Sequence, residues 1–293
     1  MRTRIILILS IILVAGCGGS ASSGDRVDVV TAFYPLFDAA ERVGRDAVSV
    51  SNLTPPGAEP HDVELSAREI EGVRSADLVL YLGSGFQPAL ERAIESASGE
   101  SFDLLEGLDL SEEAGDDDHH EGDGHEEALD PHVWLDPTRY AAIVERIGAA
   151  LGRPQAAVAL EGELSQLDAE LRAALADCER NEIVTSHAAF GYLAERYGLE
   201  QIALTGLSPE AEPTPRELER VIGEVSEHGA TTVFFETLVS PDLAETVARE
   251  TGARTAVLNP LEGLTEEELS RGEDYFSVMR DNLAALREAL GCR

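Results

Sequence analysis

Strands and helices alternate regularly in two separate stretches of this chain, and this pattern limits the possible folds more than any other feature. In the first stretch we predict strands over 27–32, 47–53, 77–82 and 101–105. In the second stretch we predict strands over 182–185, 201–205, 232–236 and 254–258. Helical patterns lie between these strands, and such alternation is typical of parallel sheets covered on both faces. We therefore expect an α/β protein of two lobes, each with a mostly parallel sheet flanked by helices.

A helical region connects the two stretches. Asp136-Pro137 begins it, because proline suits the first turn of a helix, and the pattern continues to about Leu151. A second helix is predicted over 155–177 without an internal proline, and a helix of that length spans about 35 Å. It can join the lobes as a rigid linking helix. The expected domains are a lobe over 27–136, a helical segment over 137–178 and a lobe over 179–293.

The N-terminus has the features of an export signal. Arg2 and Arg4 precede an apolar run over 5–14, which is too short to span a bilayer comfortably. The run ends in Val14-Ala15-Gly16-Cys17, which resembles a bacterial lipoprotein signal. We expect a signal peptide over 1–16, a lipid on Cys17 that anchors the protein to the membrane, and a flexible tether over 17–26. An ordinary cleaved secretory signal is the alternative. Both place the protein outside the cytoplasm.

The charge of the chain excludes one broad class of function. Its formal net charge is -34, and all 22 basic residues are arginine. A general nucleic-acid binder needs a basic face to neutralise phosphates, so we expect no nucleic acid as a partner. Apart from the N-terminus there is no long apolar run, which excludes a polytopic membrane protein.

Two further cysteines remain if Cys17 carries lipid. Cys178 and Cys292 are separated by 114 residues, in a compartment that permits disulfides. We expect a bridge between them that ties the end of a helix to the chain terminus. Two unrelated thiols are the alternative.

Three of the seven histidines follow predicted strands at equivalent places. His61 lies in the loop after the second strand, His132 follows the last strand of the first half, and His187 lies between a strand and a helix. The carboxyl ends of parallel strands share one edge of a sheet, so these imidazoles can converge in a cleft between the lobes. Imidazole is a good ligand for zinc. Taken singly, each histidine has an ordinary alternative as a capping or core residue.

Four motifs in this order resemble a known family. They are Glu59-Pro60-His61-Asp62, His132-Val133-Trp134-Leu135-Asp136-Pro137, Thr185-Ser186-His187 with Phe190-Gly191-Tyr192, and Val257-Leu258-Asn259-Pro260-Leu261-Glu262-Gly263-Leu264. Together they resemble the metal-binding lipoproteins, or solute-binding subunits, of zinc and manganese ABC importers, in their zinc-type branch. The resemblance implies a metal buried between two lobes, a membrane permease as partner and a monomeric chain.

The same resemblance implies the ligands. His61, His132 and His187 match the family's histidine positions, and the fourth ligand is a carboxylate or a water near Asn259 to Glu262. We expect Glu262, with Glu59 or a water as alternatives, because the neutral amide of Asn259 is a weak ligand. Three imidazoles and one carboxylate favour Zn²⁺ over Mn²⁺, which prefers more oxygen ligands.

An acidic loop over 111–127 carries His119, His120 and His125 just before His132. We expect these histidines to form an auxiliary site that captures zinc weakly near the cleft; the alternative is a solvated spacer. His228 is interpreted as structural, at the end of a helix.

A metal with four protein ligands has no open position for a reacting water, so no enzyme activity is expected. The expected function is extracytoplasmic capture of Zn²⁺ and its delivery to an ABC importer, with only modest movement of the lobes. The alternatives are a manganese-binding importer subunit, a surface adhesin lipoprotein of the same fold, and a zinc hydrolase with an open metal position.

Overall fold

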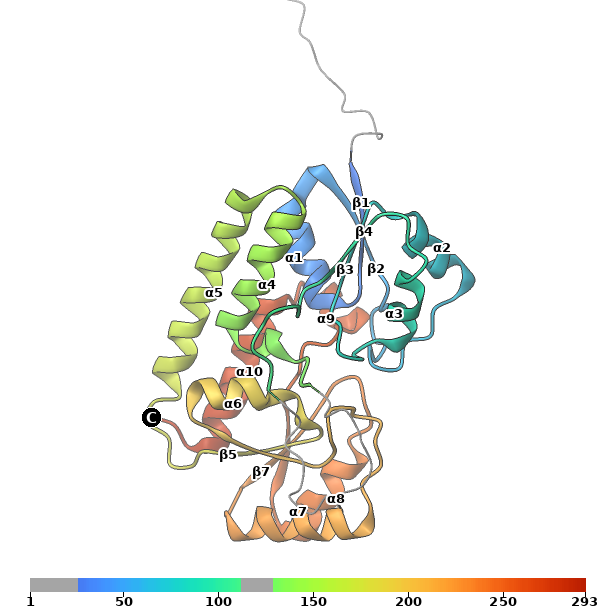
Figure 1. Cartoon of the computed structure of the whole chain (residues 1–293). Coiled ribbons are helices and arrows are strands. Elements are labelled where there is room, and N and C mark those ends of the chain that lie inside the picture. The colour runs from blue at the N-terminus through green and yellow to red at the C-terminus, as the bar shows by residue number, and fades with distance from the viewer. Residues whose placement is uncertain (1–25, 112–128) are drawn as a thin grey trace, which may run out of the picture.

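A computed structural model describes residues 26–111 and 129–293 of the chain as two lobes (Figure 1). The predicted signal peptide, Cys17, almost all of the tether, and His119, His120 and His125 lie outside these described residues. Within the described part, no helix is both long enough and apolar enough to cross a bilayer.

The first lobe is built on a four-stranded parallel sheet in the order β2-β1-β3-β4. Helices α1 and α4 lie on one side of this sheet and α2 and α3 on the other (Figure 1). Ser66 caps α2 and Glu69 reaches back to it, and together they form a capping box. The elements are β1 (Val27–Thr31), α1 (Tyr34–Gly44), β2 (Val48–Asn52), α2 (Ala67–Ser75), β3 (Leu78–Tyr81), α3 (Pro88–Ile94), β4 (Glu100–Asp103) and α4 (Pro137–Ala150).

The second lobe repeats this design with a parallel sheet in the order β6-β5-β7-β8. Neighbouring residues of a strand point to opposite faces. On β5, Val184 packs into a separate core with α7 and α8, whereas Ile183 joins the large core that continues into the first lobe. The elements are β5 (Glu182–Thr185), α6 (Gly191–Tyr197), β6 (Glu200–Ala203), α7 (Pro215–Glu227), β7 (Thr232–Phe235), α8 (Asp242–Thr251) and β8 (Arg254–Val257).

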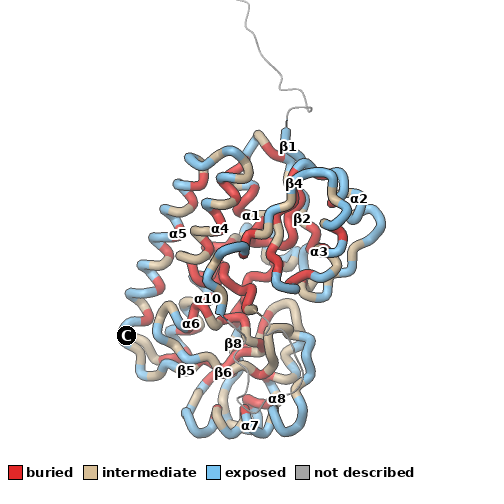
Figure 2. Tube along the Cα trace, viewed as in Figure 1, coloured by how far each residue is buried: buried red, intermediate tan, exposed pale blue. Residues whose placement is uncertain are grey.

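Two long helices run between the lobes. Helix α5 (Pro154–Ala174) packs along α4 and ends at the second lobe, as expected of the linking helix, although it stops three residues earlier than predicted (Figure 1). Helix α10 (Tyr275–Leu290) also touches both lobes. At its start, the Tyr275 hydroxyl donates to the carbonyl of Trp134 at 2.7 Å, and toward its end it packs on β5 and β8. The large core follows these helices from lobe to lobe (Figure 2).

The predicted disulfide is confirmed. Cys178 and Cys292 are bonded at an S–S distance of 1.99 Å, which ties the segment after α5 to the segment after α10. Next to the bridge, the backbone amides of Glu179 and Arg180 both donate to the carbonyl of Leu290. The ends of the two long helices are therefore joined both covalently and by hydrogen bonds.

Candidate metal centre

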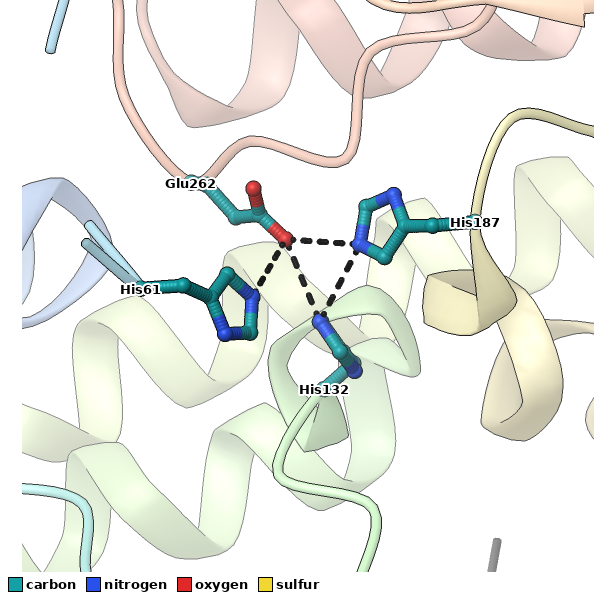
Figure 3. Close-up of side chains that lie close together, drawn as sticks. All are labelled: His61, His132, His187 and Glu262. Carbon is teal, nitrogen blue, oxygen red and sulfur yellow. Dashed lines mark hydrogen bonds and ion pairs between the residues drawn. The ribbon is translucent and has the colours of Figure 1, made fainter. Parts of the chain in front are cut away.

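Four side chains meet between the lobes, from four places far apart in the sequence (Figure 3). Oε1 of Glu262 lies 3.1 Å from Nε2 of His132, 3.1 Å from Nε2 of His187 and 3.4 Å from Nε2 of His61. The Nε2 atoms of His132 and His187 are 3.4 Å apart. All four potential ligand atoms lie within 4.8 Å of one another. The convergence that the strand-end positions predicted is therefore present.

These separations match the coordination shell of a small divalent ion. Four ligands at about 2.0–2.1 Å around a tetrahedral zinc are about 3.3 Å from each other. Buried polar atoms normally have partners, yet Nε2 of His61 and Oε2 of Glu262 are buried without a hydrogen bond. An ion at the centre would satisfy the nitrogen, and the carboxylate would bind it through one or both oxygens. The donor set thus fits a metal.

Each of the four side chains comes from a segment that connects regular elements. His61 lies in the loop after β2, and His187 is two residues beyond the end of β5. His132 comes directly before a short 3₁₀ turn, Val133–Leu135, and Glu262 lies in the segment between β8 and α9 (Glu266–Ser270). The side chains of His132, His187 and Glu262 are fully buried, whereas that of His61 is 10% exposed.

Two buried carboxylates form hydrogen bonds with the Nδ1 atoms of two of the imidazoles. Asp130 Oδ1 lies 2.7 Å from Nδ1 of His132, and Glu236 Oε1 lies 2.6 Å from Nδ1 of His187. A carboxylate accepts a hydrogen bond from Nδ1–H, so Nε2 is the ring nitrogen that can offer a lone pair to the centre. Sequence reasoning missed both acids. Glu236 directly follows β7, so the strand-end rule that selected the histidines would have found it.

The loop that carries His61 is fixed by a buried amide. Nε2 of Gln87 donates to the carbonyl of Pro60 and to Oγ1 of Thr54, both at 3.1 Å. Oε1 of Glu59 accepts from the backbone amide of His61 at 3.1 Å. The pKa of Glu59 is raised to about 9, first by burial and then by the charge of Glu262. Glu59 lies outside the set of four, and its carboxyl is engaged with the loop.

The turn that carries Glu262 is built by two asparagines. The amide of Asn282 donates to the carbonyl of Asn259 at 2.7 Å and accepts from its backbone amide at 2.8 Å. Oδ1 of Asn259 accepts from the backbone amide of Leu261, whose φ of 58° is unusual for a residue with a side chain. Asn259 therefore shapes the turn, and Glu262 is the carboxylate that faces the histidines.

Opposite charges counteract the effect of burial on the pKa values of the side chains at this centre. Burial alone would raise the pKa of the Glu262 carboxyl, but the charge of His187 and hydrogen bonds to the histidines hold it well below its usual range. Burial alone would lower the pKa values of His132 and His187. Hydrogen bonds and the charges of the neighbouring carboxylates outweigh this effect, so both pKa values are raised.

The fourth histidine among the described residues does not belong to this centre. His228 is the C-cap of α7, and its Nδ1 lies 3.5 Å from Oε1 of Glu182. This position is consistent with the predicted structural role. Asp130 N donates to the carbonyl of Ser111, and the hydroxyl of Tyr192 donates to the carbonyl of Asp130. Ser111 and Asp130 therefore meet close to His132.

Comparisons with known proteins place this geometry in a family context. A family model described as "Zinc-uptake complex component A periplasmic" matches residues 29–289. The high-affinity zinc uptake system protein ZnuA of Bacillus subtilis is 35% identical over 308 residues, which cover 97% of this chain and 96% of that protein. The zinc-binding protein AdcA of Streptococcus pyogenes serotype M3 is 35% identical over 317 residues, 98% of this chain.

The matched proteins differ in how much of their own length this chain covers. The chain spans only 61% of the length of the matched AdcA proteins. The crystal structure of the Zn(II)-bound ZnuA-like domain of Streptococcus pneumoniae AdcA aligns with a TM-score of 0.73 and 34% identity. That alignment covers 90% of this chain and 99% of the domain. The likeness therefore includes both lobes.

Proposed function

Since the chain belongs to the zinc-uptake complex component A family, we propose that it captures Zn²⁺ outside the cytoplasm and delivers it to the permease of an ABC importer. The family consists of substrate-binding transport proteins and not of enzymes. One observation supports the proposal most strongly: three imidazole nitrogens and one carboxylate oxygen converge on a single buried point. His61, His132, His187 and Glu262 are the proposed ligands.

The chemistry of the donor set favours zinc. Tetrahedral sites with nitrogen-rich ligands suit Zn²⁺, whereas Mn²⁺ prefers six oxygen ligands. The names of the relatives refer to zinc uptake or zinc binding, which supports the same choice. A shell closed by four protein groups holds its ion without a position for a reacting water, so it suits transport and not hydrolysis.

The proposal includes the place of the protein in the cell. We propose that a lipid on Cys17 anchors a monomeric chain to the outer side of the membrane, so that captured zinc stays near the permease. The name "Zinc-binding lipoprotein AdcA" of the Streptococcus pneumoniae relative supports this arrangement. The histidines at 119, 120 and 125 remain proposed as an auxiliary zinc-capturing loop.

Elemental analysis of the mature protein, combined with a zinc-versus-manganese competition titration, tests the function. We expect one Zn²⁺ per chain and a preference for zinc over manganese. His187→Ala should weaken zinc binding by orders of magnitude, because the variant loses a buried ligand and leaves Glu262 poorly paired. His228→Gln is the matched control and should bind as the unchanged protein does. Equal affinity of the His187→Ala variant, or a preference for manganese, would contradict the proposal.

A further inference from the structure

The carboxyl group of Glu236 has one hydrogen-bond partner in the described part of the chain, the ring of His187. The distance from Oε1 to Nδ1 is 2.6 Å, the Glu236 side chain is 2% exposed, and Oε2 is buried without a partner. A carboxylate in the interior is unfavourable unless it has a specific role or partner. On the basis of the proposed function, we propose that Glu236 is a positioning residue that fixes the tautomer and direction of His187 for zinc.

The hydrogen bond determines which nitrogen can bind the ion. A carboxylate can only accept, so the proton of a neutral imidazole must be on Nδ1. Nε2 then has its lone pair free, and this atom faces Glu262 at 3.1 Å and His132 at 3.4 Å. With the other tautomer, an N–H group would point at the position of the ion. Glu236 therefore keeps the proton on Nδ1, so that the proton which zinc displaces is the one on Nε2.

The ring of His187 depends on Glu236, whereas its backbone does not. The carbonyl of His187 accepts hydrogen bonds from Oγ1 of Thr185 at 2.8 Å and from Nε2 of Gln201 at 3.0 Å. These contacts fix the backbone after β5 irrespective of residue 236. A substitution at Glu236 should thus free the ring to rotate or change its tautomer while the chain path stays the same.

The sheet sets the distance between the two residues. Strands β5 and β7 are parallel neighbours, with Val184 paired to Val233. His187 and Glu236 each lie three residues beyond a member of this pair, so both leave the sheet at the same edge. The relation between the carboxylate and the imidazole is therefore built into the second lobe and does not require the lobes to close.

Asp130 forms a similar hydrogen bond with His132, but a substitution at Asp130 would test the idea less clearly. Its Oδ1 also accepts from the backbone amide of His132, and its own backbone is bonded to Ser111 and Tyr192. A substitution at Asp130 would change the ring, the backbone and the base of a loop together. Glu236 is the better choice because, among the described residues, its carboxyl forms a hydrogen bond only with the ring.

Chelator-competition titrations with Zn²⁺ test the proposal on the mature chain. Glu236→Gln keeps the size and an acceptor but removes the charge, and Glu236→Met keeps the size without a comparable acceptor. We expect zinc to bind about 10–100-fold more weakly to Glu236→Gln, as for other groups that support metal ligands, and still more weakly to Glu236→Met. If residue 236 only filled space, the three proteins would bind alike, and that result would overturn the proposal.

Asp168→Asn is the matched control, because it removes a partly buried carboxylate remote from the centre. It should bind zinc as the unchanged protein does. Unchanged binding by Glu236→Gln would overturn the role of Glu236 and leave the zinc-carrier function intact. By contrast, failure of the unsubstituted chain to bind zinc would refute the proposed function itself.

A second measurement does not depend on a substitution at residue 236. Nitrogen-15 NMR of the unsubstituted zinc-loaded protein should show zinc on Nε2 of His187 and a strongly hydrogen-bonded proton on Nδ1, with the signals assigned by their loss in His187→Gln. A purely space-filling Glu236 would not hold that proton. Zinc on Nδ1, or an Nδ1 proton without a strong hydrogen bond, would overturn the proposal.

Discussion

At the scale of single residues, a metal ion and protons compete for the same histidine nitrogen atoms. The raised pKa values of His132 and His187 mean that both rings stay protonated to a higher pH than an ordinary histidine when no metal is bound. Zinc binds only the deprotonated Nε2 atoms, so it must displace these protons. Since Glu262 stays ionised because its pKa is depressed, the histidines and not the carboxylate should control the pH dependence.

We therefore predict that zinc affinity rises with pH and continues to rise beyond the usual histidine pKa of about 6.5. The sign follows from the raised pKa values. At a pH below them both rings carry the extra proton, and at a pH above them the Nε2 atoms are free to bind zinc. Chelator-competition titrations between about pH 5 and about pH 8 would measure this slope. An affinity that stays constant across that range would show that His132 and His187 are not protonated in the metal-free protein.

The convergence of the histidines could be expected from the sequence, whereas the groups that contact them were not recognised. His61, His132 and His187 stand out because all three follow predicted strands. Glu236 also follows a strand, but it is one of 56 acidic residues, and the roles of Asp130 and Gln87 depend on which side chains they meet. A partner 49 residues away, as for His187 and Glu236, becomes visible only when the strands are paired.

At the scale of elements, hydrogen bonds to one carboxylate of α5 connect α6 to α5. Asp168 on α5 accepts hydrogen bonds from Nε and Nη2 of Arg196 at 2.9 and 3.1 Å, and from the hydroxyl of Tyr197 at 3.1 Å. Burial alone would raise the pKa of Asp168, but the bonds to Arg196 hold it below its ordinary value. This contact joins the linking helix to the second lobe.

Asp168→Asn should lower the free energy of unfolding by about 1–2 kcal/mol near neutral pH, because a charged hydrogen-bond acceptor is lost. A depressed carboxyl pKa stabilises the fold above the unfolded value of about 3.9, and this contribution disappears as the pH falls through the folded value. The difference between the two proteins should thus shrink in acid. Urea unfolding at neutral and acid pH measures it, and a difference independent of pH would contradict the role given to Asp168.

The order and type of the longer elements followed from the sequence because strand runs and helical patterns differ in period. Helix α9 was missed: it has five residues, none of them buried, so it has no apolar periodicity to detect. Its signal was Thr265 followed by Glu268, a capping box that the structure contains. The last helix begins at Tyr275 because Asp274 is its N-cap.

At the scale of the whole molecule, two helices and a disulfide restrict the relative movement of the lobes. Helices α5 and α10 both contact the two lobes, and Cys178 and Cys292 tie their ends together. Arg42 of α1 also lies 2.6 Å from Asp274, at the start of α10. Bending between the lobes would have to deform both helices together.

We therefore predict that zinc-free and zinc-loaded proteins have nearly the same overall dimensions. Small-angle scattering of the two forms should give curves that differ only slightly, because the movement is confined to loops and small tilts. A large decrease in the radius of gyration on zinc addition would refute a rigid connection. The sequence predicted one linking helix, but α10 was not recognised as a second one, because its contacts with Trp134 and Arg42 depend on the folded chain.

The four convergent side chains lie far apart in the sequence, and this separation determines when the site can form. His61 is near the beginning of the folded region, whereas Glu262 is followed by the final helix whose Asn282 shapes its turn. A nascent or unfolded polypeptide thus lacks any contiguous segment that carries the complete set. The complete site can therefore form only after the last helix has formed and packed, so binding at all four side chains must follow folding of this part of the chain.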